Sequence, residues 1–223
     1  MKNSIKLAIA DDDHIFRDIF KIFIKQFENI ELIIEVSNGK DLIDAMQNGK
    51  KPDVILLDVE MPLVNGIETM EYLSKGKLLK TKVLILTMHN NDELFNYLIE
   101  LGANGFVPKD IGFPKIIESV FDVQKTGYYF SQVDLRRIIV AKKSGIIKPV
   151  TLEEVIFSKR ELEIIQLIFQ QYSNEEISKK LCISKRTVDG HRSNLLQKTN
   201  SSNSIGLILF SLRNNLINKE LYI

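Results

Sequence analysis

The sequence predicts an α/β domain with a doubly wound, five-stranded parallel sheet, followed by an all-α domain of four helices that contains a helix-turn-helix. One observation behind this is that short apolar runs alternate five times with helical patterns before residue 125, whereas the later residues show only helical patterns. The other is a division of charge. Residues 1–125 carry 15 Lys or Arg against 20 Asp or Glu, and residues 126–223 carry 15 against 9. An acidic half joined to a basic half indicates a metal-binding or regulatory module attached to a nucleic-acid binder.

Each expected strand in the first half is a short apolar run bounded by turn residues, which is typical of strands buried on both faces of a parallel sheet. The runs cover residues 6–10, 32–36, 54–58, 83–87 and 105–107. Apolar residues recur at helical spacing in the segments that follow these runs. The helical segments cover residues 16–27, 39–46, 66–73, 92–101 and 113–124. This alternation predicts a parallel sheet with helices on both of its faces.

Polar side chains follow four of these strands, at the edge of the sheet where ligands bind in open α/β folds. They are Asp11, Asp12 and Asp13 after the first strand, Asp58 at the end of the third, Thr87 at the end of the fourth and Lys109 after the fifth. Adjacent carboxylates repel one another unless a positive charge compensates them. A hard divalent cation such as Mg²⁺, which prefers oxygen ligands, does so. The aspartate triplet by itself is equally compatible with a solvated loop that caps a helix.

Together, these groups have complementary roles in phosphoryl transfer. Asp11, Asp12 and Asp58 can hold a divalent cation. The cation and Lys109 can neutralise a phosphoryl group, and the Thr87 hydroxyl can donate to one of its oxygens. Asp58 can then act as the nucleophile, because positioning and charge stabilisation supply most of the catalysis in such a reaction.

Residues 5–125 resemble the receiver domain of bacterial two-component response regulators. The stretches that carry the resemblance are Ile9–Asp12, Leu57–Pro62, Leu86–Thr87 and Pro108–Lys109. The resemblance implies that Asp58 accepts a phosphoryl group from a sensor histidine kinase or another phosphodonor. It also implies that Mg²⁺ is held by Asp11 or Asp12, Asp58 and the backbone carbonyl of Glu60. We take Asp11 and Asp12 as the acidic pair; Asp13 then stands where relatives of this class often carry His, so that a shift by one residue stays open.

The resemblance also assigns roles around the phosphorylation site. Phe106 has the place of the aromatic residue that acts with Thr87 in the family's switch, although ordinary strand packing would explain it as well. Glu60 and His89 have the two places at which the family tunes the lifetime of the acyl phosphate. We hypothesise that His89 controls access of water; a solvated loop histidine is an equally good explanation. No enzymatic activity is expected beyond phosphorylation of Asp58 and its slow autodephosphorylation.

Residues 126–150 are expected to link the two domains, with a short amphipathic basic helix around Leu135, Ile138 and Ile139 or simply as a solvated connector. The single cysteine, Cys182, suits a reducing cytoplasm. No stretch approaches the roughly 20 apolar residues of a membrane span, and the N-terminus shows no signal peptide pattern. We therefore expect a cytoplasmic protein that does not contact a membrane.

Residues 151–223 show the start signals of four helices. Ser158 and Ser173 each precede a Glu by three residues, which is the pattern of a capping box. Ser184 can cap a third helix over residues 185–198, and a fourth is expected from about residue 202 to residue 214. Two short helices joined by a tight turn, with the second one polar and basic, are typical of a helix-turn-helix.

The third of these helices is the candidate DNA-binding element. Val188 and Leu195 lie seven residues apart and are expected to face the core. Lys and Arg on the outer side can neutralise phosphates, and Ser, Asn and Asp can meet base edges. The candidate DNA contacts are Lys185, Arg186, Thr187, Asp189, Arg192, Ser193, Asn194 and Lys198.

Residues 158–216 resemble the LuxR-type four-helix DNA-binding domain, and the whole chain resembles the NarL/FixJ class of response regulators. The matching residues are Arg160-Glu161, Ser173–Ile177, Leu181, Ile183-Ser184, Thr187-Val188, His191 and Lys198. One departure is Asp189, followed by Gly190, at a place where the family often carries Lys. An acid facing DNA lowers affinity unless it accepts a hydrogen bond, for example from a cytosine amino group. The base preference of relatives therefore does not carry over.

The family uses its fourth helix to pair two DNA-binding domains. The residues that correspond to this dimer seam, or simply to core, are Ile205, Ile208, Leu209 and Leu212. A homodimer would bind an inverted repeat in double-stranded DNA, with half-sites about one helical turn apart.

The sequence thus predicts a transcription regulator that is switched by phosphorylation of Asp58, either by release of its DNA-binding helices or by dimerisation. Three alternatives stay open. An aspartate-nucleophile phosphatase would carry Asp-x-Asp, whereas Asp58-Val59-Glu60 lacks the second Asp. A phosphorylation-independent DNA binder would not need the strand-end groups. A protein-interaction adaptor that has lost DNA binding is compatible with Asp189.

Overall fold

The computed structural model describes residues 4–75, 81–88, 92–129, 131, 134, 157–214 and 216–217. The chain divides into two compact units, Met1–Tyr129 and Phe130–Ile223. Within the described residues, no helix has both the length and the apolar character that a membrane crossing requires.

The first unit contains a five-stranded, fully parallel sheet in the order β2-β1-β3-β4-β5, which confirms the doubly wound α/β prediction. Its strands are β1 (Ile5–Ala10), β2 (Ile30–Val36), β3 (Val54–Asp58), β4 (Lys82–Thr87) and β5 (Gly105–Pro108). The strand order reverses between β1 and β3, so that a crevice opens there beyond the strand ends. β3 has the expected range, and each of the other four strands differs from its expected range by one or two residues at one end.

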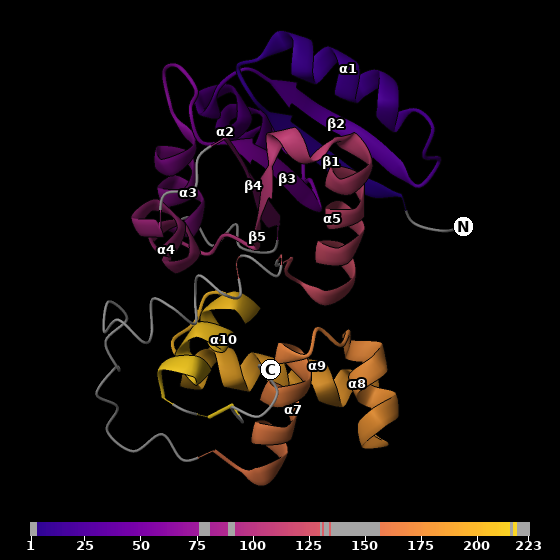
Figure 1. The fold of residues 1–223 in the computed structure, drawn as a ribbon, viewed down its shortest axis with the longest axis vertical. Coiled ribbons are helices and arrows are strands. Elements are labelled where there is room, and N and C mark those ends of the chain that lie inside the picture. Colours follow the sequence, from indigo (N-terminus) through magenta and orange to yellow (C-terminus); the bar gives the residue numbers. More distant parts are fainter. Residues whose placement is uncertain are drawn as a thin grey trace. The chain divides into compact units, whose positions relative to one another are not determined.

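Helices cover both faces of this sheet, with α1 and α5 together on one face and α2 and α3 together on the other (Figure 1). Their bounds are α1 (His14–Ile24), α2 (Gly39–Gln47), α3 (Gly66–Lys75), α4 (Asp92–Glu100) and α5 (Phe113–Thr126), and a single 3₁₀ turn, η1 (Lys109–Ile111), follows β5. Side chains alternate between the two faces along each strand. Leu56 of β3 and Leu84 of β4 therefore join Phe20 of α1 and Val120 of α5 in one buried core.

Local signals explain where the helices of the first unit begin and end. The Asp13 carboxylate accepts hydrogen bonds from the backbone N–H groups of Ile15 and Phe16, and so caps α1. Pro114 lies in the first turn of α5, and Gly127 ends that helix in the left-handed conformation. Ile19 of α1 belongs to the apolar pattern that predicted this helix, but it is 49% exposed, because only one face of the helix meets the sheet.

The second unit is helical where it is described, in agreement with the predicted four-helix domain. Its helices are α7 (Lys159–Phe169), α8 (Asn174–Leu181), α9 (Lys185–Lys198) and α10 (Ser204–Arg213). Both predicted capping boxes are present, at Ser158 and at Ser173. Helix α10 packs against α7 and α9. The expected linker of residues 126–150 lies almost wholly outside the described residues, including the basic helix around Ile138; Thr126 belongs to α5.

Candidate functional site

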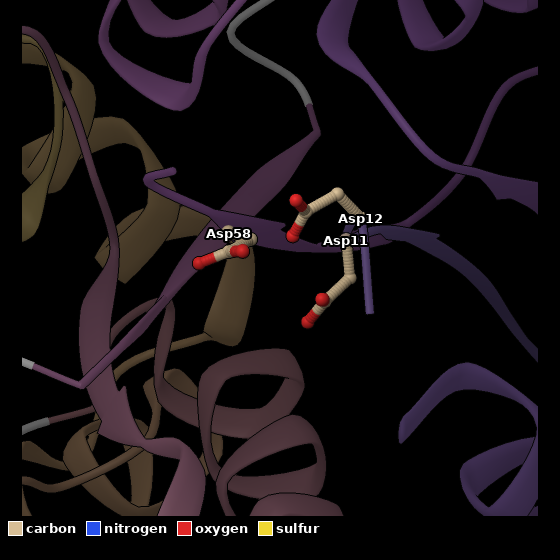
Figure 2. Close-up of side chains that lie close together, drawn as sticks. All are labelled: Asp11, Asp12 and Asp58. Carbon is tan, nitrogen blue, oxygen red and sulfur yellow. The ribbon is translucent and has the colours of Figure 1, made fainter. Parts of the chain in front are cut away.

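Three carboxylates meet at the end of the sheet where its strand order reverses. Asp11 and Asp12 follow β1 and Asp58 ends β3, and one oxygen of each lies within 4.8 Å of the other two (Figure 2). Asp11 and Asp58 are buried, whereas Asp12 is exposed. Asp13, the third member of the triplet, is occupied as the cap of α1. This geometry favours Asp11 and Asp12 as the acidic pair over a register shifted by one residue.

Lys109 connects the two buried carboxylates. Its Nζ lies 2.8 Å from Oδ2 of Asp58, and 3.0 and 2.9 Å from the two carboxylate oxygens of Asp11. Burial alone would lower the pKa of the Lys109 ammonium, but its hydrogen bonds with Asp58 and Asp11 outweigh burial and raise that pKa. The lysine therefore stays charged, and it holds Asp58 in a fixed orientation.

One lysine does not balance this much negative charge. Burial raises the pKa of Asp58 to about 6; the Asp11 carboxylate adds to this rise, while the hydrogen bond from Lys109 opposes it. Burial likewise raises the pKa of Asp11. Oδ2 of Asp11 is buried, and although it lies near Lys109 it accepts no hydrogen bond from the described residues. An additional cation with oxygen ligands fits these groups.

The Asp58 carboxylate opens into a cleft of about 170 Å³. The residues that line it are Asp12, Asp58, Val59, Glu60, Thr87, Met88, Leu94 and Lys109. Thr87 and Lys109 come from neighbouring strand ends, because β4 and β5 pair in register up to Thr87 and Pro108. The cleft thus brings together the carboxylate, hydroxyl and ammonium groups that the sequence predicted at separate strand ends. Their arrangement suits a small anionic group.

The loop after β3 depends on a glycine that sequence reasoning used only to place a helix. The N–H of Gly66 donates to the Val59 carbonyl over 2.9 Å. A Cβ on Gly66 would lie 2.2 Å from the Asp58 carbonyl oxygen and 2.8 Å from Cα of Val59. The start of α3 can approach the end of β3 this closely only because residue 66 has no side chain. Arg17 of α1 supports the other loop, since its Nη1 donates to the Asp11 carbonyl.

The side chain of Phe106, in β5, is buried. Its ring packs on Phe95 of α4, with ring centroids 4.4 Å apart and planes tilted by 39°. The sequence left strand packing and a switch role open for Phe106; this contact establishes the packing and ties the residue to α4. His89, the other residue with an expected tuning role, lies outside the described residues.

The helix-turn-helix of the second unit consists of α8, a turn of three residues and α9. Cys182 enters the turn in the left-handed conformation, with φ of 51°. Arg160 of α7 donates from Nη2 to the Leu181 carbonyl over 2.7 Å and so fixes the end of α8. On α9, Val188 and Leu195 are buried as predicted. Seven of the eight candidate DNA contacts are exposed, and Arg192 is half-buried; the exposed ones are Lys185, Arg186, Thr187, Asp189, Ser193, Asn194 and Lys198.

Two of the eight candidate DNA contacts, Lys198 and Arg192, are engaged with other helices of the unit. Nζ of Lys198 lies 2.7 Å from the buried Glu161 carboxylate, and Arg192 donates to the Asn174 and Ser204 side chains. Both side chains leave the helix beside the packed face, where a neighbouring helix offers an acceptor. These contacts engage both side chains within the unit, and their expected role as direct DNA contacts stays a prediction.

The residues proposed for a dimer seam are covered in this structure. Ile205, Ile208, Leu209 and Leu212 are 0%, 1%, 4% and 5% exposed. Their helix, α10, packs against α7 and α9, and such a small helical unit needs these apolar side chains to bury a core. They are therefore buried within this chain, as the interpretation as core expects, and their role as a dimer seam stays a prediction.

Comparison with known proteins agrees with both units. Residues 7–121 match the family described as "Response regulator receiver domain", and residues 155–211 match "Bacterial regulatory proteins, luxR family". The chain is 32% identical to the transcriptional regulatory protein YxjL of Bacillus subtilis, covering 97% of this chain and 99% of that protein. It is 30% identical to the DNA-binding transcriptional activator EvgA of Escherichia coli, covering 93% and 98%.

Among solved structures, the complex of the two-component response regulator RcsB with DNA has a similar fold. Its TM-score is 0.56 at 21% identity, and the match covers 95% of this chain and 99% of that one. The agreement spans both units of the chain and includes relatives that are transcription regulators. The chain therefore belongs to the response regulators that join a receiver domain to a LuxR-type DNA-binding domain and control transcription.

Proposed function

We propose that phosphorylation of Asp58 switches the DNA-binding activity of this response regulator. The observation that carries the proposal is the position of the Asp58 carboxylate: it ends β3, opens into a cleft, and is held by Lys109 beside two further carboxylates. In this proposal residues 1–125 are the receiver domain, residues 126–150 are the linker and residues 151–223 bind DNA. The phosphoryl group comes from a sensor histidine kinase or a small phosphodonor.

Phosphoryl transfer places a new bond between an Asp58 oxygen and phosphorus, while the bond from phosphorus to the donor breaks and the leaving group departs with its electron pair. Lys109 holds Asp58 in position and contributes positive charge beside the phosphoryl oxygens. The hydroxyl of Thr87, which lines the same cleft, donates to one of these oxygens. Fixed groups of this kind act mainly by orientation and by stabilising charge in the transition state.

Asp11, Asp12, Asp58 and the backbone carbonyl of Glu60 would hold a Mg²⁺ ion. The donor set is all oxygen, two of the carboxylates are buried with a raised pKa, and Oδ2 of Asp11 accepts no hydrogen bond from the described residues; each of these favours a hard cation. When bound, the ion would neutralise negative charge on the carboxylates and on the incoming phosphoryl oxygens.

We further propose that residues around the cleft transmit the effect of phosphorylation to other parts of the domain and set the lifetime of the acyl phosphate. Thr87 engages the phosphoryl group, and the contact of Phe106 with Phe95 transmits its displacement to α4. Glu60 lines the cleft and is exposed, so it is placed to influence the approach of water to the acyl phosphate. His89 is proposed to act with it. His89→Ala should change the dephosphorylation half-time; an unchanged half-time would reject this role.

Double-stranded DNA is the proposed partner of the second unit, and the active form is proposed to be a homodimer. The exposed cations Lys185 and Arg186 at the start of α9 support phosphate contacts, and Ser193 and Asn194 support contacts with base edges. The RcsB relative has been solved as a DNA complex, which makes this mode of binding a natural proposal here.

Intact mass spectrometry tests the switch directly. The full chain is incubated with a small-molecule phosphodonor and Mg²⁺, beside Asp58→Ala and the matched control Asp53→Asn, which alters a carboxylate at the opposite end of β3. We expect one added phosphoryl group on the unaltered chain and on the control, and none on Asp58→Ala or with chelator. Phosphorylation that persists in Asp58→Ala would reject Asp58 as the acceptor. If small donors fail, a histidine kinase must serve as donor in the same comparison.

A further inference from the structure

The exposed side of α9 contains a glycine that the helix itself does not need. Gly190 lies in the middle of Lys185–Lys198, and a Cβ at this position would meet nothing within 4 Å among the described residues. Its φ is not positive, so alanine would fit the same backbone. Because Gly is less favourable than Ala inside a helix, its presence weakens α9 without any gain in packing. A reason for it must be sought outside the folded chain.

Gly190 is central to the outer face of α9. Arg186, Gly190, Ser193 and Gln197 follow one another at spacings of four, three and four residues, which places them on one side of a helix. All four are exposed, and the buried residues Val188 and Leu195 lie on the opposite side. This is the side that can enter a groove of DNA, and the absence of a side chain at its centre allows the backbone to come close to a surface.

Asp189, beside Gly190, is held by a chain of polar contacts. Nδ2 of Asn174 donates to Oδ1 of Asp189, and Oδ1 of the same Asn174 side chain accepts from Nη1 of Arg192. Arg192 in turn donates from Nη2 to Ser204 Oγ. The two partners fix which end of the Asn174 amide faces Asp189. The exposed carboxylate of Asp189 is thus oriented from α8 before any ligand arrives.

We propose that Gly190 marks the closest approach of α9 to the floor of the major groove, and that Asp189 there accepts a hydrogen bond from a cytosine amino group. This rests on the DNA binding proposed above. A carboxylate is repelled by phosphates, so a base edge with a donor is the part of DNA from which Asp189 can accept a hydrogen bond in addition to that from Asn174. Adenine also offers an amino group, but its N7 acceptor lies next to it and repels a carboxylate; cytosine has no such neighbour. Asn174 is a positioning residue in this arrangement.

The test starts from the full chain after phosphodonor treatment. Duplexes that it enriches from a random library define its preferred site, and affinities are then measured on that site and on a second duplex with one C·G pair replaced. Gly190→Ala should raise the midpoint of thermal unfolding and yet weaken binding to the preferred site about tenfold, the size of one lost base contact. A variant that is more stable and yet binds more weakly has lost the close approach to DNA. A folding defect would instead lower both the stability and the affinity.

Asp189→Ala should remove the preference for cytosine at one position of each half-site and raise affinity for unrelated duplexes. Asn174→Ala should reduce the preference for cytosine only in part, because Asp189 is still present but is no longer held by Asn174. Glu175→Ala is the matched control, because it removes an exposed acid of α8 that pairs with Lys179. It should leave the preferred site unchanged.

Two negative results are distinguishable. If the unaltered chain binds no duplex at any salt concentration, the proposed DNA binding fails, and this inference fails with it. If the unaltered chain enriches a site and binds it in a salt-dependent way, but Gly190→Ala binds as well and Asp189→Ala enriches the same sequence, then DNA binding stands and the inference is wrong.

Discussion

At the scale of single residues, the receiver site buries carboxylates and compensates only part of their negative charge. Asp58 and Asp11 are withdrawn from water, which disfavours their charged forms, and Lys109 offsets only part of the cost. The site is therefore strained electrostatically until a cation or a proton arrives. Two measurable properties therefore depend on the same carboxylates. One is the change of the free energy of unfolding with pH, and the other is the affinity for a divalent cation.

The pH dependence follows from the raised pKa of Asp58. The folded state holds a proton on this group up to about pH 6, whereas the unfolded chain releases it near the ordinary value of 3.8. Between these values the folded state binds more protons, so stability falls as pH rises. In chelator, the free energy of unfolding should be higher at about pH 5 than at about pH 7 by on the order of 1 kcal/mol. Denaturant titrations measure it; an equally large difference in Asp58→Asn would contradict this origin.

Cation affinity distinguishes the members of the aspartate triplet. Asp11→Asn should weaken Mg²⁺ binding about tenfold or more, because it removes one of the clustered carboxylates. Asp13→Asn should leave Mg²⁺ affinity nearly unchanged, since Asn caps a helix about as well as Asp does. The chain has no Trp, so titration calorimetry is the suitable measurement. A larger loss with Asp13→Asn than with Asp11→Asn would mean that the register is shifted by one residue.

At the scale of elements, the sequence predicted most of what the structure contains. Strands buried on both faces, such as β3, read as apolar runs, and capping serines mark the starts of α7 and α8 with little ambiguity. What the sequence could not give is the direction of individual side chains. Lys198 and Arg192 sit on a polar helix and read as DNA contacts, but partners 37 and 18 residues away in the chain engage them. Such contacts depend on packing between helices, which no local pattern encodes.

The same limit applied to α1 and α10. Ile19 matched the apolar spacing of α1 but faces outward. The apolar residues of α10, for which the sequence left a dimer seam and a core role both open, are buried. A hydrophobic stripe shows that a face will be buried, and does not show whether the chain itself or a second copy will bury it. The strand-end groups were predictable for the opposite reason: parallel strands bring their carboxyl ends to one edge whatever the details of packing.

The junction of β3 and α3 gives a prediction at this scale. Gly66→Ala places a methyl group against the backbone at Asp58 and Val59, which cannot move aside as a flexible side chain can. The receiver should lose about 2–3 kcal/mol of stability, as in overpacked sites, and phosphorylation at Asp58 should slow. Gly190→Ala is the matched control: since its Cβ meets nothing within 4 Å, it should not lower stability and should leave the phosphorylation rate unchanged. Thermal unfolding and phosphorylation rate are the measurements; a neutral Gly66→Ala would show that the loop adapts.

At the scale of the whole molecule, charge limits how phosphorylation can promote DNA binding. The first 125 residues carry 20 acidic against 15 basic side chains, and the remainder carries 15 basic against 9 acidic. A phosphoryl group on Asp58 makes the acidic half more negative still. Long-range electrostatics alone would therefore weaken the attraction to DNA. Any gain in affinity must come from a change in which surfaces are displayed, or from joining two copies of the basic half.

These two routes differ in how binding depends on protein concentration and on salt. Joining two copies should make phosphorylated protein bind DNA more steeply with concentration, and should raise its molar mass in light scattering; release of the helices changes affinity without either effect. In both cases log affinity should fall linearly with log salt, because phosphate contacts release counterions. Arg186→Ala should reduce that slope by about 1 per copy, whereas Lys179→Ala, a cation on α8 that pairs with Glu175, should not. Equal slopes for both variants would mean that the exposed face of α9 is not the surface that meets the DNA backbone.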